Sequence, residues 1–443
     1  MTVFAPATLA PADVHGSLGR HLLVDGFELV LDLTASRGST LVDARDGTAY
    51  LDLFTFFASS ALGMNHPALV DDPAFTADLL EAARNKPSNS DVYTVAMARF
   101  VETFARVLGD PALPHLFFVE GGALAVENAL KVAFDWKSRW NQAHGLDRAL
   151  GTKVLHLREA FHGRSGYTLS LTNTDPVKVE RFPHFAWPRI PSPYLAPGVD
   201  VTVREAEALA AARAAFEQYP HDIACFVMEP IQGEGGDHHF RPQFLQAMQA
   251  LCHEHDALLV LDEVQTGCGL TGTAWAYQQL GVQPDVVAFG KKTQVCGVMA
   301  GGRVDEVTDN VFRVSSRINS TWGGSLVDMV RARRVLEVIE ADGLIARAVV
   351  AGAHLLTLLA GLQERHASVT DVRGRGLMVA FSLPGKGSRD AALAALRDDE
   401  RVLLLGCGTR SIRFRPALTV SEAELEAGVA ALDRVLTKLE SSQ

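Results

Sequence analysis

The sequence is poor in cysteine and carries no excess of positive charge. Only 5 of its 443 residues are cysteine, and the formal net charge is −11 at pH 7. The cysteines are odd in number and form no CxxC pair, which indicates reduced thiols rather than a disulfide framework. The acidic balance argues against a nucleic-acid-binding surface, because a phosphate backbone requires a basic protein face. The five thiols belong to Cys225, Cys252, Cys268, Cys296 and Cys407.

Long apolar runs are also absent. No run reaches the length of about 18 residues that a membrane-spanning helix requires. The nearest candidate, 348–362, is shorter and contains His354, so we interpret it as a buried helix. Residues 1–11 lack the basic start and apolar core of a signal peptide. With 48% hydrophobic and 21% charged residues, the chain is predicted to be a cytoplasmic globular protein of two or more domains.

Metal-ligand patterns are missing too. The Cys-His-Glu-His run at 252–255 contains suitable side chains, but consecutive residues cannot converge from one helix face. The same argument applies to the His-His pair at 238–239. We therefore expect no metal site, and we interpret the first group as a solvated helix end.

The most informative stretch is the segment 258–292. The apolar run 257–261 has the length of a buried parallel strand, so Asp262 follows at its carboxyl end. A second short strand, 286–289, leads in the same way to Lys291. Ligands bind outside the carboxyl ends of the strands in an open α/β sheet. The pattern therefore predicts a carboxylate and an amine in one crevice.

Pyridoxal phosphate chemistry requires such a pair. The amine bonds to the cofactor aldehyde, and the carboxylate keeps the ring nitrogen protonated, so that the ring accepts electrons. A dinucleotide site is the alternative, because Gly267-Cys268-Gly269-Leu270-Thr271-Gly272 satisfies GxGxxG and precedes a helix predicted over 273–280. That alternative is disfavoured, since the next strand ends in Gly290-Lys291-Lys292 and not in the acidic residue that ribose binding requires.

The order and spacing of these motifs resemble the class III (subgroup III) aminotransferases, which act on omega-amino acids. The match comprises the run Asp262-Glu263-Val264-Gln265-Thr266-Gly267, then Pro284-Asp285, with Lys291 six positions later. In that family the aspartate pairs with the pyridine nitrogen, the glutamine approaches the phenolic oxygen and the lysine carries the cofactor. The resemblance therefore implies that Asp262, Gln265 and Lys291 hold pyridoxal 5'-phosphate.

The resemblance also assigns the other cofactor contacts. Gly122 and Ala123, at the start of a helix predicted over 124–140, would hold the phosphate by backbone N–H groups. The family has Ser-Gly-Thr there, so the missing hydroxyl groups leave the phosphate to amides and to residues from elsewhere. Phe161, in a Phe-His-Gly-Arg run, would stack on the ring. Thr321 would reach the phosphate of a neighbouring subunit, which implies a homodimer with shared sites.

Two arginines are the implied substrate contacts. Arg164 would clamp a distant carboxylate, because its planar guanidinium binds in a bidentate manner, with Asn319 assisting. Arg413 would bind glutamate or 2-oxoglutarate but would be unpaired against an omega-amine donor. The family solves this problem with an Arg-Glu pair that opens and closes, and the matching glutamate is Glu234. Gln265 is also expected to contact the substrate.

Departures from the common family pattern indicate the amino donor. Leu270 and the run Gly-Lys-Lys-Thr-Gln-Val-Cys-Gly are similar to members that transfer the terminal amine of L-lysine to 2-oxoglutarate. The expected products are 2-aminoadipate 6-semialdehyde and L-glutamate, with Lys291, Asp262 and Glu234 as catalytic residues. Ornithine or 4-aminobutyrate is the nearest alternative donor. A mutase or racemase is more distant, and a nicotinamide dehydrogenase is the remotest.

The fold prediction follows from alternating strands and helices between about 110 and 290. They predict an α/β fold with a mostly parallel sheet covered on both faces. The family implies fold type I, with a seven-stranded sheet in the large domain and a smaller α+β domain. The expected divisions are 1–60 (an N-terminal part of the small domain), 61–325 (the large cofactor-binding domain) and 326–443 (the C-terminal small domain).

The predicted elements outside the sheet are few. In the N-terminal part we expect a helix over 18–23 and strands over 29–33, 40–43 and 49–53. The aromatic segment 54–60 is either a core strand or a wall of the substrate pocket. Amphipathic helices are expected over 327–339 and 344–363, and a capping box at Ser421 and Glu424 begins the last helix.

Overall fold

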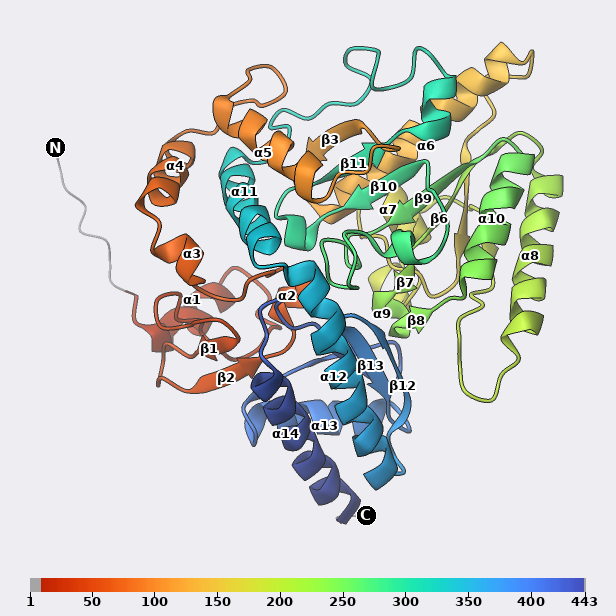
Figure 1. Cartoon of the computed structure of the whole chain (residues 1–443). Helices are drawn as coiled ribbons and strands as arrows, with labels where there is room; N and C mark the ends of the chain where they lie inside the picture. The colour runs from red at the N-terminus through yellow and green to blue at the C-terminus, as the bar shows by residue number, and fades with distance from the viewer. Residues whose placement is uncertain (1–8, 442–443) are drawn as a thin grey trace.

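A seven-stranded sheet forms the centre of the larger part of the molecule (Figure 1). The computed structural model describes residues 9–441. All neighbouring strands of the sheet are parallel except β11, which is antiparallel to both of its neighbours. The mostly parallel α/β sheet predicted from the sequence is thus confirmed. In spatial order the strands are β3 (His115–Val119), β11 (Cys296–Ala300), β10 (Val286–Phe289), β9 (Leu258–Asp262), β6 (Ile223–Met228), β4 (Lys153–Leu157) and β5 (Arg189–Ile190).

The central strands are apolar at nearly every position because both faces of the sheet are covered. In β9, Leu258 and Val260 belong to one hydrophobic core, and Leu259 and Leu261 belong to the core on the opposite face. Helix α6 packs on β6, β9, β10 and β11, whereas α10 packs on β6 and β9 and is flanked by α8 (Figure 1).

Helices connect and cover the sheets. The longer α-helices are α4 (Pro73–Arg84), α5 (Val95–Val107), α6 (Gly122–Ala143), α8 (Val201–Gln218), α10 (Pro242–Glu254), α11 (Leu326–Ala341), α12 (Leu344–Arg365), α13 (Lys386–Asp398) and α14 (Glu422–Ser441). The shorter ones are α1 (Val14–Gly19), α2 (Thr55–Ala58), α3 (Pro67–Val70), α7 (Gly166–Leu171) and α9 (Gly233–Gly236), with 3-10 turns η1 (Pro11–Asp13), η2 (Pro176–Lys178), η3 (Ala276–Gln279), η4 (Lys291–Thr293) and η5 (Gly302–Glu306). The helices predicted over 124–140, 327–339 and 344–363 are therefore confirmed as α6, α11 and α12.

The smaller part contains a four-stranded antiparallel sheet, below the large sheet in Figure 1. Its order is β12 (Thr370–Arg375), β13 (Met378–Ser382), β16 (Ser411–Phe414) and β15 (Leu405–Cys407). The predicted capping box at the start of α14 is present, since Ser421 N–H donates to Glu424 Oε2 and Glu424 N–H donates to Ser421 Oγ. A hairpin, β7 (Ile231–Gln232) with β8 (His238–His239), lies between the two parts of the chain that carry the larger sheets.

The N-terminal segment hydrogen-bonds to the C-terminal part of the chain. Strands β1 (Thr40–Val42) and β2 (Ala49–Asp52) form a sheet with β14 (Val402–Leu403), which pairs in parallel with β2. The domain limits predicted at 60/61 and 325/326 stay predictions, and residues 1–8 of the first segment lie outside the described residues.

Two predictions for the N-terminal segment are wrong. The expected strand 29–33 contributes only an isolated bridge, Leu31 to Asp43, and the expected helix 18–23 is displaced to Val14–Gly19. Of the two alternatives for the segment 54–60, the strand is not formed, whereas Ser59 lines a cavity, as the pocket-wall alternative expects. Thr55–Ala58 form a left-handed turn with φ between 42° and 69°. The Asp52 carboxylate accepts hydrogen bonds from the N–H groups of Phe54 and Thr55, which holds this strained conformation.

Helix α12 is the one helix among residues 9–441 that is long and apolar enough to cross a membrane, with a mean hydropathy of 1.8 in its most apolar window. It packs on β12, β13 and α14, and Leu355, Leu359 and Leu362 are fully buried. Gly352 allows the close approach, because a Cβ atom there would lie 2.0 Å from the Gly376 carbonyl oxygen. One face of α12 is thus buried against the small sheet, whereas 33% of its apolar window is buried in all and Val349 and Val350 are exposed.

His366 ties α14 to the end of α12. Its Nδ1 lies 2.8 Å from Glu440 Oε2, and its Nε2 lies 2.6 Å from Asp433 Oδ1. Burial alone would lower the pKa of His366, but the two carboxylates outweigh this and raise the pKa above its ordinary value of 6.5. The charged ring therefore contributes stability that is fully present below pH 6.5 and is lost as the pH rises through the raised pKa.

We predict that His366→Gln lowers the melting temperature by a few degrees at pH 6, consistent with a loss of about 1 kcal/mol for a partly exposed ion pair. At pH 9 the deficit should be smaller, because a smaller fraction of the wild-type rings is then charged. Scanning calorimetry of both proteins at the two pH values measures the difference. An equal deficit at both pH values would contradict the role of the charge.

Candidate active site

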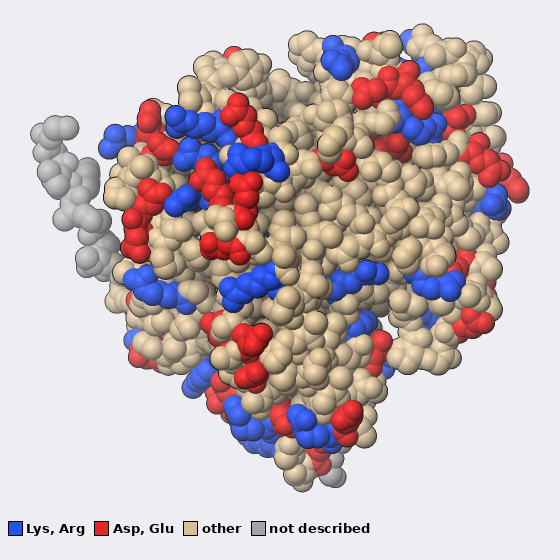
Figure 2. Space-filling model, in the orientation of Figure 1, with Lys and Arg blue, Asp and Glu red and all other residues tan. Residues whose placement is uncertain are grey.

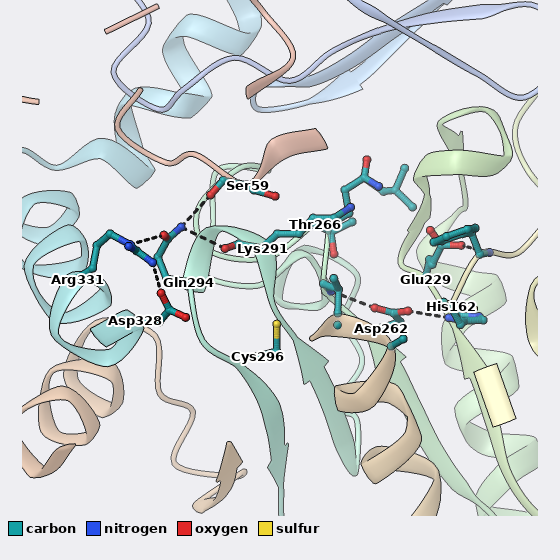
Figure 3. Close-up of a pocket in the computed structure, with 17 residues that line it drawn as sticks. Ser59, His162, Glu229, Asp262, Thr266, Lys291, Gln294, Cys296, Asp328 and Arg331 are labelled. Carbon is teal, nitrogen blue, oxygen red and sulfur yellow. Dashed lines mark hydrogen bonds and ion pairs between the residues drawn. The ribbon is translucent and has the colours of Figure 1, made fainter. Parts of the chain in front are cut away.

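A cavity of about 550 Å³ opens at the carboxyl ends of β6, β9 and β10, where the sequence analysis expects the ligand. Asp262 is the last residue of β9, and Lys291 follows β10 by two residues. Figure 3 shows both side chains in this cavity. It also shows Ser59, which follows α2, and Asp328 and Arg331, which belong to α11. The predicted site residues that line the cavity are Gly122, Ala123, Phe161, Asp262, Gln265 and Lys291.

Lys291, and not its neighbour Lys292, faces the cavity. Lys292 is 2% exposed, does not line the cavity and donates from Nζ to the Ala58 carbonyl oxygen at 2.8 Å. Burial and the positive charge of Arg413 lower the pKa of Lys291 to about 8. A much larger fraction of this amine is therefore neutral, and nucleophilic, at physiological pH than in an exposed lysine.

The backbone of the lysine loop is strained and is braced by Gln294. Lys291 has φ = 56° and Gln294 has φ = 61°, in the left-handed region that non-glycine residues rarely adopt. Gln294 Nε2 donates to the carbonyl oxygens of Ser59 and Lys291, and its Oε1 accepts from Arg331 Nε at 3.0 Å (Figure 3). The sequence analysis missed Gln294, whose only signal was its place in the unusual run after Lys291.

Asp262 is hydrogen-bonded to His162. Asp262 Oδ2 lies 2.7 Å from His162 Nδ1, and Asp262 Oδ1 accepts from Val264 N–H at 3.1 Å (Figure 3). Burial alone would lower the pKa of His162, but the hydrogen bond and charge of Asp262 raise it. The sequence analysis quoted His162 within a motif and assigned it no role. The His162 ring behind Asp262 is therefore more readily protonated than an ordinary histidine.

Phe161 is positioned through its backbone by Glu229. The carboxylate of Glu229 accepts from Phe161 N–H at 3.0 Å and from Gly233 N–H at 3.1 Å. Burial raises the pKa of Glu229 to about 7. Glu229 was also missed as a site residue, although it stands directly after β6 at the ligand edge of the sheet.

The start of α6 is suited to an anion. Its N-cap, Gly121, has φ = 106° and provides no side-chain cap, so the first amides of this 22-residue helix have no partner from a capping side chain. Gly122 and Ala123 line the cavity at this point. Gly163 packs against the helix start, because a Cβ atom there would lie 2.5 Å from Ala123 Cβ. The described residues therefore fit the phosphate, ring and aldehyde of pyridoxal phosphate.

Gln265 is oriented by a buried ion pair. Its Oε1 accepts from Arg415 Nε at 2.9 Å, which leaves the amide nitrogen as the group that can donate toward a ligand. Arg415 pairs with Asp237, and both side chains are at most 1% exposed. The sequence analysis assigned no function to Arg415.

Arg413 is the buried cation beside the cavity. Its Nη2 lies 3.1 Å from Glu234 Oε2, whereas its Nε and Nη1 have no hydrogen-bond partner among the described residues. Burial would raise the pKa of Glu234, but Arg413 and Lys178 outweigh it and hold the pKa below its ordinary value. Neither Arg413 nor Glu234 lines the 550 Å³ cavity, although the charge of Arg413 reaches Lys291.

Three further predicted residues lie outside the cavity of their own chain. Arg164, Asn319 and Thr321 are exposed, and none of them lines it. The loop that carries Asn319 and Thr321 is anchored by Ser90, which donates to the Ser320 carbonyl oxygen, and by Asn89, which donates to the Gly324 carbonyl oxygen. The expected contacts of these three residues stay predictions.

The competing sites find no support in the structure. In the GxGxxG run, Gly269 and Gly272 pack against Ile345 and Val349 of α12, so helix side chains fill the space a dinucleotide would need. The helix predicted over 273–280 is only the short turn η3. Within residues 9–441 no group of His, Cys, Asp and Glu side chains is placed to hold a metal ion, and all five cysteines are free thiols.

A buried lysine of lowered pKa and a buried carboxylate, at neighbouring strand ends of this sheet, are the arrangement of fold-type I pyridoxal phosphate enzymes. The aminotransferase class-III family model matches residues 24–436. An L-lysine-epsilon aminotransferase of Mycobacterium tuberculosis is 70% identical over 430 residues, which is 96% of each chain. Another, from Amycolatopsis lactamdurans, is 62% identical over 445 residues, which is 98% of each chain.

A solved structure gives the same result. Lysine aminotransferase from Mycobacterium tuberculosis superposes with a TM-score of 0.96 at 68% identity, and the match covers 97% of this chain and 100% of that one. The chain therefore belongs to the class-III aminotransferase family, and it is a pyridoxal-phosphate-dependent aminotransferase.

The lowered pKa of Lys291 predicts how the cofactor-free protein takes up pyridoxal phosphate. Only the neutral amine bonds to the aldehyde, so the uptake rate, followed by absorbance, should rise with pH through a midpoint near 8. Arg413→Gln removes a neighbouring positive charge and should move the midpoint to higher pH. A midpoint near 10.5, the ordinary lysine value, would show that burial does not tune this amine.

Proposed function

We propose that the chain transfers the 6-amino group of L-lysine to 2-oxoglutarate, giving 2-aminoadipate 6-semialdehyde and L-glutamate. The relatives at 60–70% identity that carry the name L-lysine-epsilon aminotransferase support this substrate. The structural observation that carries the proposal is Arg413, a buried guanidinium with two unpaired nitrogens that is covered by Glu234. Such a pair suits an enzyme that accepts two chemically different substrates in turn.

The described residues divide the chemistry among them. When bound, pyridoxal phosphate supplies an aldehyde that accepts the amino group and a ring that withdraws electrons. Lys291 moves the proton between carbon atoms as general base and acid, and its lowered pKa suits that role. Asp262, backed by His162, keeps the ring nitrogen protonated. Phe161 limits the ring to one plane, and the amides at Gly122 and Ala123 hold the phosphate.

Two arginines account for two substrates. With L-lysine, the reacting end carries no carboxylate, so Glu234 stays on Arg413 and neutralises it. With 2-oxoglutarate, the carboxylate next to the reacting carbon replaces Glu234 on Arg413. Both substrates carry a carboxylate at the end far from the reacting carbon, which is the only carboxylate of L-lysine and the second of 2-oxoglutarate, and Arg164 is the candidate to bind it. Arg164 is exposed and makes no ion pair with a described residue.

A homodimer with shared sites follows from the position of Thr321. This residue is exposed, does not line its own cavity and is followed by Trp322, a large apolar side chain that is 38% exposed. Other exposed apolar side chains include Leu23 and Tyr93. Figure 2 shows a broad area with few charged side chains over the part that contains the large sheet. Such an area suits contact with a second copy, from which Thr321 and Asn319 would complete the site.

The cytoplasm is the proposed location. All five cysteines are free thiols, and four of them are buried. Free thiols persist in a reducing compartment.

A panel of amino donors with 2-oxoglutarate tests the proposed substrate. We expect kcat/KM for L-lysine to exceed that for L-ornithine and 4-aminobutyrate by about tenfold or more, because chain length sets where the far carboxylate meets Arg164. Glutamate formation is the readout, and omission of 2-oxoglutarate is the control. Preference for ornithine or 4-aminobutyrate would assign the activity to those donors. Turnover without 2-oxoglutarate would instead indicate a mutase or racemase.

A further inference from the structure

Glu234 has a second cationic partner, Lys178, which no sequence motif indicated. Lys178 Nζ lies 2.5 Å from Glu234 Oε1, whereas Arg413 Nη2 lies 3.1 Å from Glu234 Oε2. The carboxylate therefore offers one oxygen to each cation. The side chains of Lys178 and Arg413 are 14% and 4% exposed and that of Glu234 is 28% exposed, so both ion pairs are partly shielded from water.

The second ion pair matters because Glu234 must leave Arg413 whenever a substrate carboxylate takes its place. A partly buried carboxylate that loses its cation is strongly destabilised. Without Lys178, Glu234 would have no cationic partner left among the described residues once it releases Arg413. With Lys178 in place, Oε2 can leave while Oε1 keeps its ion pair.

We propose that Lys178 is a positioning residue that keeps Glu234 paired while Arg413 binds the carboxylate of the amino acceptor. This inference rests on the proposed function, in which Arg413 serves 2-oxoglutarate and not the amine end of L-lysine. Lys178 thereby lowers the free-energy difference between the state in which Glu234 pairs with Arg413 and the state in which Arg413 is free to bind the acceptor. Loss of Lys178 should therefore weaken the binding of 2-oxoglutarate and leave the reaction with L-lysine nearly unchanged.

The surroundings of Lys178 suit this role. It ends η2, and its Nζ also donates to Thr174 Oγ1 at 3.1 Å, so the ammonium group is fixed from two directions. It lies 5.5 Å from the centre of the Phe161 ring, which links it to the wall of the main cavity. A cleft of about 330 Å³, lined by Thr174, Lys178 and Glu234, gives the carboxylate room to turn away from Arg413.

The test compares neutral and charged replacements of Lys178 in the holoenzyme. Lys178→Met and Lys178→Gln remove the charge, and Lys178→Arg keeps it. Lys153→Met is the matched control, because it removes a lysine–carboxylate pair, with Asp222, that lies at the start of β4 and away from the site. Calorimetric titration with 2-oxoglutarate gives its dissociation constant, and single-turnover kinetics give the half-reaction with L-lysine. Thermal melting shows whether each variant is folded.

Both neutral variants should weaken 2-oxoglutarate binding about tenfold, a coupling of ordinary size between linked groups. The half-reaction with L-lysine should change less than about twofold, and Lys178→Arg and Lys153→Met should resemble the wild type. In a Glu234→Ala background, Lys178→Met should add no further loss, because Lys178 acts through Glu234.

Three results would overturn the proposal: equal losses with both substrates, the same tenfold loss in the Glu234→Ala background, or an arginine variant as weak as the methionine variant. Failure of the proposed function looks different. In that case the wild type itself shows no lysine turnover that depends on 2-oxoglutarate, or Glu234→Ala affects donor and acceptor alike.

Discussion

The burial of one lysine amine beside a permanent cation is the interaction on which the rest of the site depends. Burial and Arg413 both disfavour the charged form of Lys291, and together they lower its pKa to about 8. The sheet makes this possible, because parallel strands covered on both faces end at one water-poor edge. The same edge brings Asp262 into the cavity as the opposing charge.

Strain at this edge is balanced by side-chain hydrogen bonds from distant parts of the chain. Lys291 and Gln294 have left-handed backbone conformations, and so does the turn Thr55–Ala58. Gln294 connects the two segments by donating to the carbonyl oxygens of Ser59 and Lys291. Arg331, from α11, fixes Gln294 in turn. Such conformations persist only where the surrounding structure determines them strongly.

The remaining charges of the site are distributed as buried pairs. Asp262 has His162, Asp237 has Arg415, and Glu234 has both Arg413 and Lys178. Burying a charge is unfavourable unless a partner is present, so each pair removes a cost that either member alone would impose. Arg413 is the exception, because two of its nitrogens have no partner among the described residues. That exception matches a group whose partner changes with the substrate.

Local patterns explain which features the sequence could predict. Strands β6 and β10 are continuous apolar runs and β9 is apolar up to Asp262, so the positions of residues 262 and 291 follow from where two of these runs end. Two strands of the sheet, β5 and β11, were missed, since β5 has only two residues and β11 begins with Cys296-Gly297.

Contacts between distant segments explain what was missed. The left-handed turn at 55–58 depends on Asp52 and on the carbonyl oxygen of Arg415, 360 positions away, which no local propensity records. The roles of His162, Glu229, Gln294 and Lys178 likewise arise from partners far away in the sequence. The role proposed for Thr321 likewise requires a partner outside its own cavity, which this residue does not line.

The central claim is that the amine of residue 291, and not that of its more deeply buried neighbour Lys292, bonds to the cofactor. Borohydride reduction of the purified yellow protein would fix that bond irreversibly, and mass spectrometry of the peptides would locate the added cofactor mass. The structure predicts the added mass on Lys291, because Lys292 donates to the Ala58 carbonyl oxygen and points away from the cavity. Modification of Lys292 in place of Lys291, or of neither lysine, would contradict it.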